Sequence, residues 1–398
     1  MTAIFPLSDD LNNKSDCFSE DLSHEIATTP FHKLLNAIEL ARRADEDILY
    51  FSFEEFQLDI DESTLEEIII EVAEKKIYFL YVDVDYDEKM PINERLSVIS
   101  SIHGVRSFIL LRPIFNYITE ILSFHNIDNV GELDFFKIIA PHNFLIDVKS
   151  NWILPESKIH VISPFRNVEK YILECYNSII EQKYTNFHIH FINDNSDDLG
   201  GMLIPIHTHV SVKENDVRKY ALLNIIETLC EKEFDDEDII CIVDGDDKLP
   251  HDAVFSIVNS CYKSFDCLMT YGSLAHYNKI RKHGGVYEAI DFENIRNAYW
   301  HYFPLRTFKY KVFREFLKQD PHLNQIKRSD GSFLEMPYDM ALFFNLLEIT
   351  GYYRLHFIDT IMYEYRGHPN NDFNTNGKLQ KQGENEVRSK GSLIRKEF

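Results

Sequence analysis

The sequence predicts an α/β protein of two domains, a smaller one followed by a larger one built around a mostly parallel sheet. Short apolar segments typical of buried strands alternate with longer amphipathic segments typical of helices along most of the chain. Polar residues and Pro155 interrupt this alternation near residues 148–157, after which it begins again. The length of 398 residues is too long for one typical core and by itself suits two domains or one large one.

Composition narrows the class of function. Hydrophobic residues make up 44% of the chain, enough for packed cores, and the formal net charge is −24. So acidic a chain is not expected to bind nucleic acid, because phosphate affinity comes from clustered Lys and Arg. The six cysteines form no C-x-x-C pair, so free thiols are expected. With no signal peptide and no apolar run of membrane length, we expect a cytoplasmic protein with at most peripheral membrane association.

The first 150 residues divide into a leader and a small domain. Residues 1–30 are polar and lack periodicity, which predicts a disordered leader. Residues 31–150 predict an α/β accessory domain of unassigned role. The predicted helices are 34–43, 63–75, 91–102 and 114–124, and the predicted strands are 47–53, 77–84 and 105–111. Because strands alternate with helices, a small parallel sheet is expected. The acids at 83, 85 and 87 are interpreted as a solvated strand end.

The same alternation continues in the second part of the chain, which predicts a domain at 157–373. Its predicted strands are 159–163, 188–193, 238–243 and 267–271, and its predicted helices are 168–182, 219–230 and 252–263. Residues 374–398 are polar, and the segment from Gly377 onwards is predicted to be a frayed tail.

An acidic turn is the strongest local feature. The apolar strand 238–243 ends abruptly in Asp244, Gly245, Asp246 and Asp247. In an open parallel sheet the carboxyl ends of the strands face the ligand crevice. Carboxylates gathered there repel one another unless a cation or hydrogen bonds neutralise them, and a hard divalent ion does this well. The alternative is a solvated acidic turn before a helix.

Two polar loops follow the strands on either side of the first predicted helix. The first contains Pro164 and Arg166 and precedes the helix, so it can present a cation and backbone amides to an anion. The second begins at Asp194, which can accept hydrogen bonds from a base or a ribose. The glycine-rich dinucleotide fingerprint is absent, and ordinary Asn/Asp/Ser turns are the alternative interpretation.

Seven segments, in order, resemble glycosyltransferase family 2, which has the GT-A fold. They are VISPFRN (161–167), SIIEQKYTNFHIHFINDNSDD (178–198), residues 213–224, IVDGDDKL (242–249), and residues 304–309, 338–342 and 363–372. The resemblance covers roughly residues 157–373. It implies a Rossmann-like, mostly parallel sheet with flanking helices.

The resemblance also implies a reaction: metal-dependent, inverting transfer of a sugar such as a hexose from a UDP- or GDP-sugar to an acceptor hydroxyl. Mn²⁺ or Mg²⁺ would be held by Asp244, Asp246 and His368, and Asp339 would be the general base. The residues implied in nucleotide-sugar binding are Pro164, Arg166, Asp194, Arg218, Asp244, Gly245 and Asp247. The acceptor is left open among a glycan, a lipid-linked glycan and a protein.

The sequence departs from the family pattern at three places. Asn193 precedes Asp194 where two acids are usual, Val217 replaces a frequent glycine, and Tyr338 precedes Asp339 where the family has Glu. For Asp339 the alternative interpretation is a cap of a helix at 340–349, and for His368 it is a loop histidine. A nucleotidyltransferase and a catalytically inactive binding module of the same fold are the alternative functions.

Overall fold

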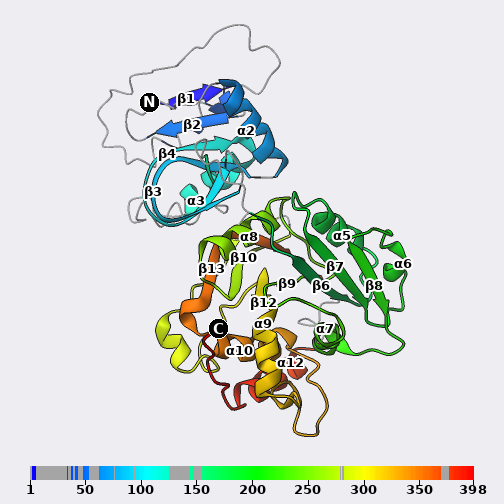
Figure 1. Cartoon of the computed structure of the whole chain (residues 1–398). Helices are drawn as coiled ribbons and strands as arrows, with labels where there is room; N and C mark the ends of the chain where they lie inside the picture. Colours follow the sequence, from blue (N-terminus) through cyan, green and yellow to red (C-terminus); the bar gives the residue numbers. More distant parts are fainter. Residues whose placement is uncertain are drawn as a thin grey trace. The chain divides into compact units, whose positions relative to one another are not determined.

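The chain forms two compact units, residues 1–153 and residues 154–398, each with its own sheet and apolar core (Figure 1). The computed structural model describes residues 2–5, 34, 37–38, 41–43, 48–52, 62–75, 77–92, 96–124, 144–146, 155–277, 279, 282–368 and 376–398. The candidate functional residues all belong to the second unit.

The first unit is built on a five-stranded sheet in the order β1-β2-β4-β3-β5. Neighbouring strands run antiparallel except for β3 with β5, which are parallel. Phe79 and Phe108 stack at 5.0 Å in its core. The elements are β1 (Thr2–Phe5), β2 (Ile48–Ser52), α2 (Glu62–Glu74), β3 (Phe79–Pro91), β4 (Leu96–Leu111), η1 (Arg112–Ile114), α3 (Phe115–Phe124) and β5 (Phe144–Ile146).

The predicted parallel sheet of the first unit is therefore wrong, and so is the predicted helix at 91–102. Most of that segment belongs to β4, which pairs with β3 as a hairpin closed by Ile92 N donating to Leu96 O at 2.8 Å. Residues 96–99 are all buried, and their β-branched members favour an extended backbone. Residues 2–5 of the predicted leader form β1, and residues 6–30 lie outside the described part. So do the side chains at 83, 85 and 87, whose backbones lie on β3.

The second unit has an eight-stranded sheet in the order β11-β10-β12-β9-β6-β7-β8, with β13 beside β10. Strands β9, β6, β7 and β8 are parallel, and β12 joins them antiparallel to β9. The predicted α/β class is confirmed. The strands are β6 (Ile159–Phe165), β7 (Phe187–Asn193), β8 (Val210–Glu214), β9 (Ile239–Ile242), β10 (Met269–His276), β11 (Lys282–His283), β12 (Arg306–Lys309) and β13 (Leu355–Tyr365).

Helices cover both faces of this sheet. Figure 1 shows α5 and α8 on one face and α7, α9, α10 and α12 on the other. The helices are α5 (Ile172–Ile180), α6 (Gly200–Leu203), α7 (Tyr220–Glu231), α8 (Val254–Ser264), α9 (Tyr310–Gln319), α10 (Tyr338–Thr350) and α12 (Gly377–Arg388), with the short 3₁₀ turns η3 (Ala289–Glu293), η4 (Asn324–Ile326) and η5 (Tyr352–Arg354). The core joins Ile162 and Ile240 of the sheet to Leu222 of α7 and Phe343 of α10.

Helix α10 lies inside the second unit. Residues 340–347 are all buried, so the helix is covered on every side, as expected of a mostly apolar helix enclosed by its own domain. Its amino end therefore has a fixed place relative to the sheet. That end carries Tyr338 and Asp339.

The predicted frayed tail is wrong. Residues 377–388 form α12, and Val387 on this helix is fully buried in the main core. Gly383 and Val387 are one turn apart and share a face, whereas the charged residues of α12 lie on its other faces. The apolar face of α12 is so narrow that the sequence of this polar segment does not indicate a helix.

Candidate functional site

The predicted loops meet at the carboxyl end of the parallel strands. Strand β6 lies between β7 and β9, with Phe165 opposite Asn193 and Ile162 opposite Ile242. Beyond the strands, Asp194 N donates to Phe165 O at 2.8 Å, and Gly245 N donates to Pro164 O at 3.3 Å. The loops after three neighbouring strands thus lie side by side, at the sheet edge where ligands bind in open α/β folds.

Glycine is required within the acidic turn by close packing. A Cβ added to Gly245 would lie only 2.5 Å from the Cβ of Phe165, which cannot move without displacing β6. The turn is closed by Asp247 N donating to Asp244 O at 3.0 Å. Gly245 thus lets the acidic turn lie directly against the end of β6, and this packing role stands beside the predicted role in donor binding.

The three carboxylates of the turn have different surroundings. Both oxygens of Asp244 accept from the hydroxyl of Tyr338, at 2.8 and 2.9 Å. Asp247 is buried, and its Oδ1 accepts from the backbone N–H of Arg366 at 2.7 Å. Asp246 is partly exposed, and its Oδ2 lies 2.9 Å from Nε2 of His368. The turn therefore offers one buried acid and two that face other side chains.

Negative charge is unfavourable at this turn. Burial, followed by the charge of Asp246, raises the pKa of Asp244 to about 7, although the Tyr338 hydrogen bond opposes the shift. Burial, followed by the charges of Asp246 and Asp244, raises the pKa of Asp247 well above its ordinary value. A carboxylate with a raised pKa gains most from a nearby cation, so the electrostatics of the turn suit a divalent ion.

The donor atoms also suit such an ion. Neighbouring ligands of an octahedral ion with bonds of about 2.1 Å are about 3.0 Å apart, close to the separation of Asp246 Oδ2 and His368 Nε2. Asp244 can add a further oxygen. Among the described residues, no three His, Cys, Asp or Glu side chains already surround a common point. An ion would therefore have to draw Asp244 towards the other two ligands.

Asp339 lies in the first turn of α10 and has two partners. Its Oδ1 accepts from the backbone N–H of Met340 at 2.8 Å, and its Oδ2 accepts from Nη2 of Arg306 at 2.8 Å. Arg306 is buried and is itself held by the carbonyl of Tyr302. Because Tyr338 bonds Asp244, two consecutive residues of α10 connect the acidic turn to the candidate base.

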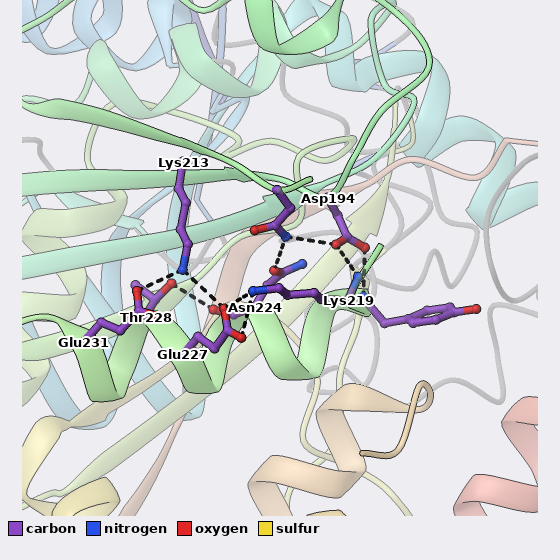
Figure 2. A network of polar contacts seen from close by, with 9 residues as sticks. Asp194, Lys213, Lys219, Asn224, Glu227, Thr228 and Glu231 are labelled. Carbon is purple, nitrogen blue, oxygen red and sulfur yellow. Dashed lines mark hydrogen bonds and ion pairs between the residues drawn. The ribbon is translucent and has the colours of Figure 1, made fainter. Parts of the chain in front are cut away.

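Asp194 is bound by its own chain. Its carboxylate accepts from Lys219 N at 2.7 Å, Tyr220 N at 2.9 Å and Nδ2 of Asn215 at 3.1 Å, and the residue is buried. Figure 2 shows this carboxylate above the start of α7, where Lys219 and Asn224 also reach neighbouring groups. Asp194 therefore fixes the loop 215–220, and its predicted contact with a base stays a prediction.

The two arginines that are predicted to bind the nucleotide sugar differ in how they are held. Nη2 of Arg166 donates to Asp197 at 2.7 Å, and its Nη1 donates to the carbonyls of Asp194 and Asn195, so it braces the loop after β7. Arg218 is exposed, and its guanidinium lies 4.0 Å from the ring centre of Tyr220. Arg218 stands at the surface of the loop that Asp194 fixes.

Arg366 is a cation that sequence reasoning gave no role. Its Nε donates to Asp246 O at 3.0 Å, its Nη2 pairs with Glu174 at 2.7 Å, and its guanidinium lies 3.9 Å from the ring centre of Tyr277. Together with the backbone contact to Asp247, these bonds make Arg366 one of the residues that join the end of β13 to the acidic turn. Its place within the family-like segment 363–372, two residues before His368, was the available signal.

The raised pKa of Asp244 predicts a gain in stability on neutralisation. Above pH 7 and without metal, the Asp244 carboxylate is charged in both the folded and the unfolded protein, but only the folded protein disfavours that charge. Ionisation of Asp244 therefore lowers the free energy of unfolding. Asp244→Asn keeps an oxygen for Tyr338 and removes this charge. In EDTA at pH 8 we expect a gain of about 2 kcal/mol.

Thermal unfolding between pH 5 and 8 checks this prediction. As pH falls through 7 the wild-type carboxyl takes up a proton in the folded state, so the advantage of the variant should shrink towards pH 5. Asp252→Asn is the control, because Asp252 pairs with Lys183 at 3.3 Å and has a cation nearby. A variant less stable than the wild type at pH 8 would contradict the prediction.

Comparisons with known proteins show what this region is similar to. The family model described as glycosyl transferase family 2 matches residues 160–318. Glycosyltransferase GlyA of Streptococcus pneumoniae serotype 4 is 47% identical over 49 residues, which are 12% of this chain and 7% of that protein. The family match confirms the resemblance for residues 160–318.

Two solved structures resemble the chain at low identity. S. aureus TarS 1–349 in complex with UDP-GlcNAc has a TM-score of 0.38 and 17% identity, covering 53% of this chain and 59% of that one. The mannosyltransferase PcManGT from Pyrobaculum calidifontis, in complex with GDP-Man and Mn²⁺, has a TM-score of 0.34 and 16% identity, covering 55% of this chain and 61% of that one. This chain thus spans about three-fifths of each solved chain.

A separate observation concerns membranes. Among the helices of the described residues, none combines the length and the apolar character needed to cross a bilayer.

Proposed function

Because residues 160–318 match glycosyl transferase family 2, we propose that the chain transfers a sugar from a nucleotide-diphosphate sugar to an acceptor hydroxyl, with inversion and with a divalent metal ion. The observation that carries this proposal is the acidic turn after β9. Asp244 and Asp247 have raised pKa values, and Asp246 faces His368 at 2.9 Å. A cation bearing a diphosphate is the natural complement of such a site.

Asp244, Asp246 and His368 are the proposed ligands of Mn²⁺ or Mg²⁺. When bound, the ion would offset negative charge as it develops on the leaving diphosphate. Asp247 and Arg366 stabilise the acidic turn. The backbone N–H of Arg366 donates to Asp247, and the guanidinium of Arg366 donates to the carbonyl of Asp246. They hold the ligand-bearing backbone in place, and Asp247 lies beside the proposed donor sugar.

Asp339 is the proposed general base. The oxygen of the acceptor hydroxyl forms a bond to the anomeric carbon while the bond from that carbon to the diphosphate oxygen breaks. The hydroxyl proton passes to the Asp339 carboxylate, whose orientation Arg306 and the Met340 amide fix. A single displacement of this kind inverts the anomeric carbon.

The nucleotide is proposed to lie over the loops after β6 and β7. Pro164 is a residue of β6, and its carbonyl accepts from Gly245 N. Arg218 is exposed beside the second loop, and Arg166 and Asp194 hold these loops together. A UDP- or GDP-sugar is the proposed donor.

A thermal-shift screen tests the function. UDP- and GDP-sugars are added with Mn²⁺, with Mg²⁺ and with EDTA. We expect one donor to raise the melting temperature only with metal, since a ligand at about 100 times its Kd stabilises by about 2.7 kcal/mol. Release of the nucleoside diphosphate from that donor should also require metal. Absence of both effects across the donor panel would point instead to an inactive module.

A further inference from the structure

The carboxyl-terminal helix α12 is fastened to α10 by a buried arginine. Arg296 is 2% exposed and forms two hydrogen bonds to Glu348 of α10, at 2.7 and 2.8 Å. Its Nη2 also donates to Asn345 of α10 at 2.8 Å, and its Nη1 donates to the carbonyl of Val387 at 2.8 Å. One side chain thus joins the second half of α10 to the second half of α12. A buried guanidinium with so many charge-assisted hydrogen bonds is a rigid connection.

The chain after α12 strengthens the same connection. Leu393 N donates to Glu348 Oε2 at 2.9 Å, and Lys396 N donates to the carbonyl of Ile349 at 2.9 Å. Arg388 reaches back to the carbonyl of Ala298 at 3.0 Å. The end of α10 far from the candidate base therefore has several independent attachments to the carboxyl-terminal segment.

A second attachment lies next to the candidate base. Gly383 of α12 packs against the backbone of Met336. A Cβ added to Gly383 would lie 3.0 Å from the carbonyl carbon of Met336 and 3.1 Å from Cδ of Pro337, and closer still to the carbonyl oxygen of Met336. Only a glycine allows this approach. Pro337 is the N-cap residue of α10, so this contact lies directly before Tyr338 and Asp339.

We propose that α12 positions the candidate base, with Gly383 and Arg296 as the positioning residues. Two attachments along a helix determine where its axis lies, and here they are at the start of α10 and in its second half. Tyr338 bonds Asp244 and Asp339 bonds Arg306, so a shift of the segment 336–337 would disturb both contacts at once. The inference rests on the proposed function only in taking Asp339 as the base.

Gly383→Ala is the variant that tests the proposal. Alanine favours a helix more than glycine does, so α12 itself is not weakened and any effect comes from the contact with Met336. The matched control is Gly377→Ala on the same helix, where an added Cβ meets nothing within 4 Å. Both variants are made in the full chain and compared by circular dichroism, melting temperature and steady-state kinetics.

We expect Gly383→Ala to lower kcat by about 10- to 100-fold, as a small misplacement of a catalytic group does, and to change the donor KM by less than about 3-fold. Gly377→Ala should keep wild-type kinetics. If Gly383→Ala does not fold, Val387→Ala takes its place, because it loosens the packing of α12 without adding atoms. In Val387→Ala we then expect a smaller fall in kcat, again with little change in the donor KM. Wild-type kcat in the folded variant, or equal losses in Gly377→Ala, would overturn the proposal.

Amide hydrogen exchange separates this inference from the proposed function. Peptides that cover residues 336–342 should exchange faster in Gly383→Ala than in the wild type and in Gly377→Ala, whether or not a donor is turned over. A wild type without transferase activity but with this exchange pattern would remove the proposed function and keep the positioning role of α12. Unchanged exchange in Gly383→Ala would remove the positioning role.

Discussion

Replacing Asp246 with Asn should abolish metal-dependent transfer, by about 10²-fold or more in kcat/KM. Asp246 is the partly exposed acid of the turn, and its Oδ2 lies 2.9 Å from the imidazole of His368. The Asn side chain has nearly the same size as Asp but lacks the negative charge that would hold a divalent ion. It also removes one of the negative charges near Asp244. The metal-induced rise in melting temperature with donor should therefore disappear, whereas the melting temperature of the metal-free protein should not fall.

The control for this prediction is Asp236→Asn, which removes an equal charge from an exposed ion pair with Arg314 before strand β9. That variant should bind donor and metal as the wild type does. His368→Gln provides a second comparison, since it removes the nitrogen donor opposite Asp246 and should weaken metal binding less than the loss of a charged ligand. Full metal-dependent activity in Asp246→Asn would show that the acidic turn does not hold the ion.

The part of the fold that sequence reasoning predicted well is the parallel half of the second unit. Strands β6, β7 and β9 are short apolar runs, each followed by polar turn residues, and amphipathic helices separate them. This pattern has one common solution, a parallel sheet with crossover helices. The same rule places the loops after these strands at one edge, which is why Asp194 and Asp244 could be assigned to one site from sequence.

The elements that were predicted wrongly share a physical cause. Residues 91–102 contain a short apolar run that fits either a helix or a strand, and only pairing with β3 decides between them. Helix α12 has few apolar residues, and its stability comes from contacts with Arg296 and the core that lie far away in the sequence. Tertiary contacts override weak local preference in both segments.

The candidate site shows the same limit. The sequence identifies carboxylates at strand ends, yet it gives no sign that Tyr338 bonds Asp244 across 94 positions or that Arg366 bonds Asp247 across 119. From the sequence, Tyr338 is only a departure from an acid of the family pattern. In the structure the departure has a consequence, because a phenol donates to a carboxylate where a second acid would repel it. One fewer negative charge therefore surrounds Asp244.

Replacing Asp339 with Asn should lower kcat by about 10²-fold or more while leaving metal-dependent donor binding intact. Asn keeps an oxygen that can accept from the Met340 amide, so the side-chain contact within the first turn of α10 is preserved. It cannot accept a proton from the acceptor hydroxyl, so the loss should fall on the chemical step. Donor affinity from thermal shift and kcat from nucleoside diphosphate release measure the two effects separately.

Asp339→Asn also changes the ion pair with Arg306, which is buried and lies 2.8 Å from the Asp339 carboxylate. Asp339→Asn leaves this guanidinium without its carboxylate, so some loss of stability is expected and must be distinguished from loss of chemistry. Arg306→Lys is the comparison: it weakens the same pair but leaves the Asp339 carboxylate present, so it should retain far more transfer than Asp339→Asn at equal melting temperature. If Asp339→Asn keeps near wild-type kcat while Asp339→Ala loses stability, Asp339 serves only to stabilise the first turn of α10, and another group must accept the proton.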